Sequence, residues 1–220
     1  MITGLIPATA GTVEAFGAPR RREADFREVR ARAGLVFQDP DDQLFCPTVL
    51  EDVAFGPANL GQTRRQALET ARATLDALGL AGFEDRITHR LSGGEKRLVS
   101  IAAVLAMQPD VLLLDEPTTG LDPEAYGRLC DLLATLPQAM IIAAHDAEFL
   151  ARLATSALVV RDGRCRRAAI HALAHAHSHA HLHVEDEAHD HSHGAAGPVP
   201  RPDQREQAIA ASAPSGRLRR

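Results

Sequence analysis

Two adjacent acidic side chains follow a short apolar run. Asp115 and Glu116 come directly after Val111–Leu114 and before Pro117. In an open parallel sheet, ligands bind at the carboxyl ends of the strands. One carboxylate at such an end can hold Mg²⁺, and the next can orient a water that attacks a phosphate. By itself, the pair is just as typical of solvated acids at the end of a strand.

A second candidate lies upstream, where Ser92, Gly93, Gly94 and Glu95 form a capping-box pattern. Ser92 is expected to cap a helix whose free N–H groups and positive dipole end attract anions. The two glycines allow a phosphate to approach the backbone closely. The alternative is an ordinary helix cap, because the SxxE pattern occurs by chance in many chains.

Two further polar residues follow apolar runs that look like strands. His145 comes directly after residues 138–144, and Gln38 comes directly after residues 32–37. Both are expected at the sheet edge that carries Asp115 and Glu116. There His145 is a candidate for contact with a phosphate. Gln38 is a candidate to coordinate Mg²⁺ or to hold the attacking water. Alone, each is more typical of a structural or solvated residue.

The pattern of apolar residues predicts an α/β fold that positions these side chains. Runs that are apolar on both faces predict strands buried in a parallel sheet and covered by helices. The expected strands are 32–37, 110–114, 138–144 and 157–160, with an edge strand of a hairpin at 11–16. The expected helices are 64–78, 92–107 and 123–136.

Composition narrows the class of protein. The chain has 220 residues, a formal net charge of −5 and 45% hydrophobic residues. The negative charge argues against a broad nucleic-acid surface. Its apolar runs are too short to span a bilayer. The three scattered cysteines fit a reducing cytosol and argue against a disulfide framework.

Taken together, these motifs resemble those of the ATP-binding cassette (ABC) ATPases over about residues 1–167. The segment LSGGEKR at 91–97 resembles the ABC signature, VLLLDEP at 111–117 resembles Walker B, and TTGLDP at 118–123 resembles the D-loop. Gln38 resembles the Q-loop glutamine and His145 the switch histidine. The order and the spacings are those of the family, which makes the joint match highly specific.

The resemblance implies a RecA-like lobe, with a parallel sheet and helices on both faces, and a helical lobe at about 41–90. It implies ATP and Mg²⁺ as cofactors, held between two such ATPase subunits that pair head to tail. Asp115 and Gln38 would serve Mg²⁺, and Glu116 would be the general base. Ser92, Gly93 and Gly94 would contact the γ-phosphate bound by the other subunit. Asp122 would help to set the dimer contact.

A narrower resemblance concerns residues 36–45 and 51–57, VFQDPDDQLF and EDVAFGP. They are similar to the ATPases of energy-coupling-factor importers, in particular to the cobalt and nickel branch. This implies a transmembrane partner that docks around residues 38–53, and a peripheral location on the cytoplasmic face of the cell membrane.

Nine of the eleven histidines lie between residues 171 and 193, in a segment of otherwise small and acidic residues. We expect residues 168–220 to form a disordered tail, because they lack large apolar residues. Imidazoles mixed with carboxylates suit Ni²⁺, Co²⁺, Zn²⁺ or Cu²⁺, and the resemblance to the cobalt and nickel branch favours Ni²⁺ or Co²⁺ on this tail. A solvated tail without a specific role is the alternative. The candidate ligands are His175, His177, His179, His181, His183, His189, His191 and His193.

The chain contains no GxxxxGK[ST] phosphate-binding loop, which is Walker A in this family. We expect a misassigned start codon, with Walker A encoded upstream, and we expect ATP hydrolysis only if that region is present in the protein. Apolar surface would be left uncovered where the preceding strand would pack. The alternative is a non-catalytic partner, or a metal-binding or storage protein that uses the histidine-rich tail.

Overall fold

The computed structural model describes residues 2–173 and 179–184, all of which lie in one compact unit, Met1–Glu185. Its strands are β1 Val13–Ala15, β2 Ala18–Arg20, β3 Ala33–Val36, β4 Val111–Asp115, β5 Ala139–Ala143, β6 Ala157–Arg161, β7 Arg164–Leu173 and β8 His179–Val184. Its helices are α1 Glu23–Arg32, α2 Val49–Asn59, α3 Arg64–Ala77, α4 Gly93–Leu105, α5 Pro123–Thr135 and α6 Ala147–Leu153, with short 3₁₀ turns at Pro40–Asp42 and Thr88–Arg90.

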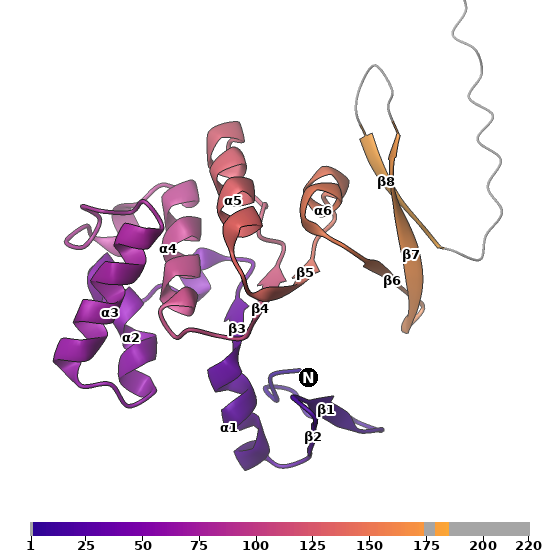
Figure 1. Ribbon diagram of the computed structural model, residues 1–220, viewed down its shortest axis with the longest axis horizontal. Coiled ribbons are helices and arrows are strands. Elements are labelled where there is room, and N and C mark those ends of the chain that lie inside the picture. Colours follow the sequence, from indigo (N-terminus) through magenta and orange to yellow (C-terminus); the bar gives the residue numbers. More distant parts are fainter. Residues whose placement is uncertain (1, 174–178, 185–220) are drawn as a thin grey trace, which may run out of the picture. The chain divides into compact units, whose positions relative to one another are not determined.

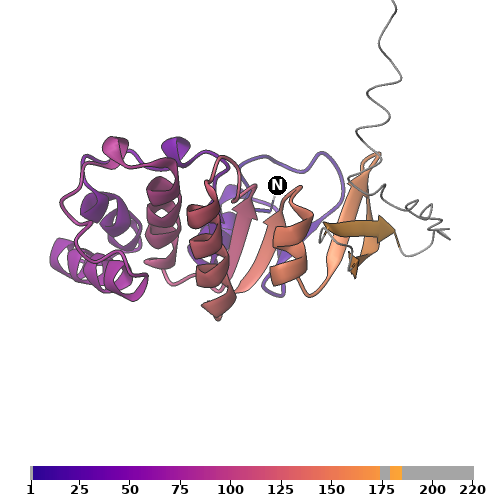
Figure 2. The same ribbon diagram turned by 90° about the horizontal axis from the view of Figure 1, so that it is seen from above.

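Strands β3, β4 and β5 form a parallel sheet with β4 in the middle. Leu112 and Leu114 of β4 are buried on one face, against side chains from α4, α5 and α6. Figure 2 shows these three helices side by side along the sheet. Leu113 points to the opposite face, where it packs with Phe26 and Val29 of α1. The predicted α/β class, a parallel sheet with helices on both faces, is confirmed.

On the α1 side, the sheet is only partly covered. Ile141 of β5 lies beside Leu113 in the strand register, so the two residues share a face. The side chain of Leu113 is buried, whereas Ile141 is 55% exposed. On this face, β5 is therefore open to solvent at Ile141, next to the part of β4 that α1 covers.

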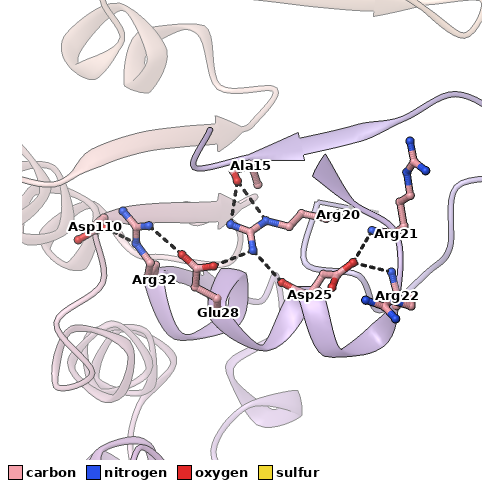
Figure 3. A network of polar contacts seen from close by, with 8 residues as sticks. All are labelled: Ala15, Arg20, Arg21, Arg22, Asp25, Glu28, Arg32 and Asp110. Atoms are coloured by element: carbon pink, nitrogen blue, oxygen red, sulfur yellow. Dashed lines mark hydrogen bonds and ion pairs between the residues drawn. The ribbon is translucent and has the colours of Figure 1, made fainter. Parts of the chain in front are cut away.

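A ladder of charged contacts ties the β1–β2 hairpin to α1, and α1 to the start of β4 (Figure 3). The buried guanidinium of Arg20 donates to the carbonyl of Ala15 and to Glu28, the latter at 2.7 Å. Glu28 also accepts from Arg32, which donates to Asp110 at 2.7 Å. These bonds fix α1 against the face of the sheet that it covers.

Helices α2 and α3 pack on each other and on α4 around an apolar cluster that includes Val53, Ala71, Leu75 and Val99. Both helices open with capping boxes, formed by Thr48 with Glu51 and by Thr63 with Gln66. This pair corresponds to the expected helical region at about 41–90. No helix in the described part of the chain has the length and apolar character that a membrane crossing requires.

One expectation about the C-terminal part is wrong. Residues 157–160 do not join the parallel sheet, because β6 pairs antiparallel with β7 in a separate sheet that continues to β8 (Figure 1). Strand β7 continues past residue 167 to Leu173, and β8 covers His179–Val184, where histidine alternates with Ala, Leu and Val in the two-residue period of a strand. The disordered tail expected over residues 168–220 stays a prediction. Residues 174–178 and 185–220 lie outside the described residues.

Candidate functional site

Glu116 and His145 come together where β4 and β5 end. Asp115 pairs with Ala143 in the parallel register, so the residues that follow each strand emerge at the same edge. The Nε2 atom of His145 lies 3.2 Å from Oε1 of Glu116. The Glu116 side chain is 19% exposed, whereas that of His145 is 98% exposed. The imidazole thus contacts the carboxylate and remains open to a ligand.

The backbone of Glu116 is held in an unusual conformation. Its φ is +42°, in the left-handed region that non-glycine residues seldom adopt. Its N–H donates to the carbonyl of Ala143 at 2.7 Å, which anchors this turn to the end of β5. Such conformations cost on the order of 1 kcal/mol or more and concentrate at functional sites. The turn after β4 therefore fixes the point from which the carboxylate projects.

Gln38 and Asp115 line a second part of the same edge. An open cavity of about 680 Å³ lies between the segment after β3, the start of α4 and the segment after β4. Its walls include Gln38, Gly93, Lys96, Asp115 and Thr119. The cavity therefore unites the predicted Mg²⁺ ligands, Gln38 and Asp115, with one glycine of the LSGG segment.

The cap of α4 forms as the sequence predicts. The N–H of Glu95 donates to the Ser92 hydroxyl at 3.3 Å, and the Glu95 carboxylate accepts from the N–H of Ser92 at 2.8 Å. The hydrogen bond from the backbone N–H of Ser92 lowers the pKa of Glu95, and Arg86, which donates to the same carboxylate at 2.8 Å, lowers it further. The N–H groups of the first turn of a helix have no intrahelical partner and favour anions.

The two glycines of this segment have different surroundings. Gly93 is exposed, and a methyl group added there would approach nothing nearer than the carbonyl oxygen of Gly120, at 3.9 Å. Gly94 is buried, and a methyl group there would lie 2.5 Å from the Cβ of Ala125 in α5. The sequence interpretation gave both glycines the same reason. The structure adds a packing reason at Gly94, while phosphate contact at either glycine stays a prediction.

Asp122 caps α5, since its carboxylate accepts from the N–H of Ala125 at 2.9 Å. This bond accounts for the residue within the chain, and its predicted role in a dimer contact stays a prediction. Sequence reasoning did not single out Arg97, which lines the cavity and is 1% exposed. A signal was available, because Ile101 and Val104 follow Arg97 at four and seven residues and so share its helical face, which places a charge on the apolar stripe of α4.

The histidine-rich segment is only partly covered by the structure. His175, His177, His189, His191 and His193 lie outside the described residues, and His179, His181 and His183 belong to β8. Within the part of the chain whose side chains are described, no three His, Cys, Asp or Glu residues gather as a metal site would require. Metal binding by the tail stays a prediction.

Comparisons with known proteins identify the family to which the chain belongs. The family model described as ABC transporter matches residues 1–119. A putative ABC transporter ATP-binding protein of Brucella suis is 56% identical over 170 residues, which cover 77% of this chain and 71% of the relative. The energy-coupling factor transporter ATP-binding protein EcfA of Methanocaldococcus jannaschii is 44% identical over 165 residues, covering 73% and 59%.

Among solved structures, cbiO1 from Clostridium perfringens, described as part of the ABC transporter complex cbiONQ, superposes with a TM-score of 0.67. It is 34% identical, and the match covers 74% of this chain and 67% of that one. The family model covers more than half of the 220 residues, and the Brucella relative is matched over most of its own length. The chain therefore belongs to the ABC transporter family, as an ATP-binding subunit.

Proposed function

We propose that this chain hydrolyses ATP to power a membrane importer of the energy-coupling-factor type, with cobalt or nickel ions as the transported substrate. The observation that carries the hydrolytic part is the contact between Glu116 and His145, 3.2 Å apart at the ends of adjacent parallel strands. Similarity to EcfA and to cbiO1 supports the class of importer.

The chemistry of the residues fits ATP and Mg²⁺. The Asp115 carboxylate and the Gln38 amide line one cavity, and both offer the oxygen atoms that Mg²⁺ prefers. The start of α4, with Ser92 and Gly93, suits a phosphate. When bound, the nucleotide with its Mg²⁺ supplies the γ-phosphoryl group and a stabilised leaving group.

The residues of the chain have separate roles in this proposal. Glu116 is the general base: its carboxylate orients the attacking water and accepts its proton, from a position set by the left-handed turn after β4. His145 donates from its exposed imidazole to a phosphate oxygen, and its contact with Glu116 keeps the ring close to the reacting water. Gln38 and Asp115 orient the metal.

The proposed assembly rests on the resemblance to ABC ATPases, and of the residues it involves Ser92 and Gly93 are exposed while Gly94 is buried. Ser92, Gly93 and Gly94 would meet the nucleotide of a second ATPase subunit in a head-to-tail pair, with Asp122 at the contact. A transmembrane partner would dock around residues 38–53 and hold the chain at the cytoplasmic face of the membrane. The exposed ring of Phe45, stacked edge-on against Phe55 at 4.8 Å, gives that region an apolar contact.

The hydrolytic role is tested by Glu116→Gln in the protein made from its native gene and assembled with its partners. We expect the rate of phosphate release to fall by about 100-fold or more while ATP binding persists, because the amide cannot accept the proton. Glu124→Gln, an exposed change at the start of α5, is the matched control and should leave the rate unchanged. Undiminished hydrolysis by Glu116→Gln would show that the base is another residue.

The transported substrate is tested separately, by uptake of Co²⁺ and Ni²⁺ in cells that carry either the native gene or the Glu116→Gln form. We expect the variant to accumulate less of one of these ions. If hydrolysis is lost and the uptake of both ions is unchanged, the cargo belongs to another chemical class.

A second candidate function, a non-catalytic partner or a metal-binding or storage protein, is favoured by one observation on β7 and β8. Their register places His171 opposite His181, and residues 179, 181 and 183 share one face of the strand by alternation. Replacing the histidines of residues 171–193 with asparagine keeps the length of the segment. Titration with NiCl₂ should then lose its bound equivalents, and retained stoichiometry would contradict metal binding there.

A further inference from the structure

The side chain of Arg97 joins the signature helix to the segment that carries Gln38. Arg97 lies in α4, one turn after the Ser92 cap, and is almost fully buried. Its two terminal nitrogens donate to consecutive carbonyls, NH1 to Phe37 at 2.6 Å and NH2 to Gln38 at 2.5 Å. One guanidinium thus binds the carbonyls of the two peptide units on either side of the Gln38 Cα.

If Arg97 served only to stabilise the fold, an arginine at this buried position would be an unfavourable choice. Burial lowers the pKa of Arg97, because desolvation disfavours the charged form. Its Nε atom is buried and has no hydrogen-bond partner among the described residues. An apolar side chain on the stripe with Ile101 and Val104 would avoid both costs. An apolar residue would lack the planar guanidinium, whose donating nitrogens hold two acceptors in one orientation.

Other contacts show that the segment and the helix are fastened together. Gln43 accepts from the N–H of Phe37 at 3.2 Å and donates to the carbonyl of Ser100 in α4 at 2.7 Å. Lys96 donates to Asp41 at 2.6 Å. In both of these contacts, a side chain of the loop after β3, that of Gln43 or Asp41, is joined to α4. Arg97 alone among them bonds to the backbone of Gln38 itself.

We propose that Arg97 is a positioning residue that couples the position of Gln38 to the start of α4. The proposal rests on the proposed ATPase function for its consequence, and on the contacts above for its geometry. When binding of a nucleotide moves the Ser92–Gly94 end of α4, the hydrogen bonds from Arg97 to the carbonyls of Phe37 and Gln38 move the Gln38 amide with it. Arg97 acts through Gln38 and has no contact of its own with the reacting atoms.

The experiment is a double-mutant cycle between Arg97→Met and Gln38→Ala in the protein from its native gene, assembled with its partners. We expect Arg97→Met to lower kcat about tenfold and to raise the Mg²⁺ concentration for half-maximal activity, with the KM for ATP changed less than twofold, because a misplaced group loses rate steeply. In the Gln38→Ala background the same change should cost less than about twofold. An equal loss in both backgrounds would overturn the proposal.

Two further variants separate positioning from folding. Arg97→Lys keeps the charge but can satisfy only one carbonyl well, so kcat should fall between those of the parent and Arg97→Met. Arg65→Met changes an exposed arginine of α3 and should match the parent. If Arg97→Lys is as slow as Arg97→Met and both melt at much lower temperatures than the parent, Arg97 is structural and the proposal is wrong.

Hydrogen exchange gives a readout that needs no activity. In Arg97→Met, amides of residues 37–43 should exchange at least about tenfold faster, while those of α3 keep the parent rate. Unchanged exchange at residues 37–43 would overturn the coupling. A parent protein that hydrolyses no ATP, but whose loop responds to Arg97→Met, would contradict the proposed function and leave the coupling in place.

Discussion

Replacing Gly94 by alanine tests whether the second glycine of the LSGG segment is required by packing. The added methyl group would lie 2.5 Å from the Cβ of Ala125, whereas ordinary contacts between such atoms are 3.4–4 Å. The start of α5 would have to move by about 1 Å. Overpacking of this kind costs about 1–3 kcal/mol of the free energy of unfolding.

Gly93→Ala is the matched control, because it adds the same methyl group one residue earlier in the same helix. Its nearest neighbour would be a carbonyl oxygen at 3.9 Å, so there is no clash. Both changes gain roughly 0.5–1 kcal/mol from the better helix propensity of alanine, and this gain cancels in the comparison. The difference between the two variants is therefore the cost of the clash, about 2 kcal/mol at the middle of that range.

The assay is thermal unfolding of the two variants side by side. In a chain of this size, 1 kcal/mol shifts Tm by about 2–4 °C, so Gly94→Ala should melt about 4–8 °C below Gly93→Ala. Adding Ala125→Gly to Gly94→Ala removes the opposing methyl group and should recover part of the loss. Equal Tm values for Gly93→Ala and Gly94→Ala would refute the packing argument.

Three other predictions concern the polar groups around the two lobes. Asp52 is 4% exposed and accepts from two backbone N–H groups and from Thr88. Asp52→Ala should therefore lower the free energy of unfolding, measured in urea, by about 3 kcal/mol or more, against about 1 kcal/mol for Thr88→Val. Burial, with the nearby charge of Asp52, raises the pKa of the Cys46 thiol to about 11, so its alkylation by iodoacetamide should rise about tenfold per pH unit from 8 to 10, and levelling near pH 9 would contradict this. The pKa of Glu95 is lowered in the folded chain, so its contribution is present above the ordinary value of 4.5 and is lost as pH falls below it. The Tm gap between the parent and Glu95→Gln should therefore shrink toward pH 3, and a constant gap would disprove it.

The strand ends that carry the candidate site were predictable because their signals are local. An apolar run followed by Asp115 and Glu116 marks both the strand and its end, and Ser92 with Glu95 marks the start of α4. Helix α1 gave no such signal, since only Phe26 and Val29 face the core in ten otherwise polar or small residues. The charged ladder along α1 fixes it against the sheet, and this depends on partners distant in sequence.

The features that the sequence analysis missed depend on which segments pair or pack with one another. Residues 157–160 were assigned to the parallel sheet on apolar content, but the partner of β6 is the next strand along the chain, joined by a tight turn at Asp162 and Gly163. The histidine-rich composition concealed the two-residue period of β8, where histidine alternates with Ala, Leu and Val. Gly94 and Arg97 could be placed in a motif, yet their contacts are made 31 and 59–60 residues away. No local pattern reports such distances.

The start of α4 is the point at which separate parts of the site meet. Arg97 fastens it to Gln38, Gly94 packs it against Ala125 of α5, and Gly93 lies next to Gly120 in the segment after β4. Glu116 is instead anchored to the end of β5, through Ala143 and His145. A ligand that displaces the start of α4 would therefore shift Gln38 relative to the proposed base, whereas Asp115, which directly precedes Glu116 at the end of β4, would keep its position beside that base.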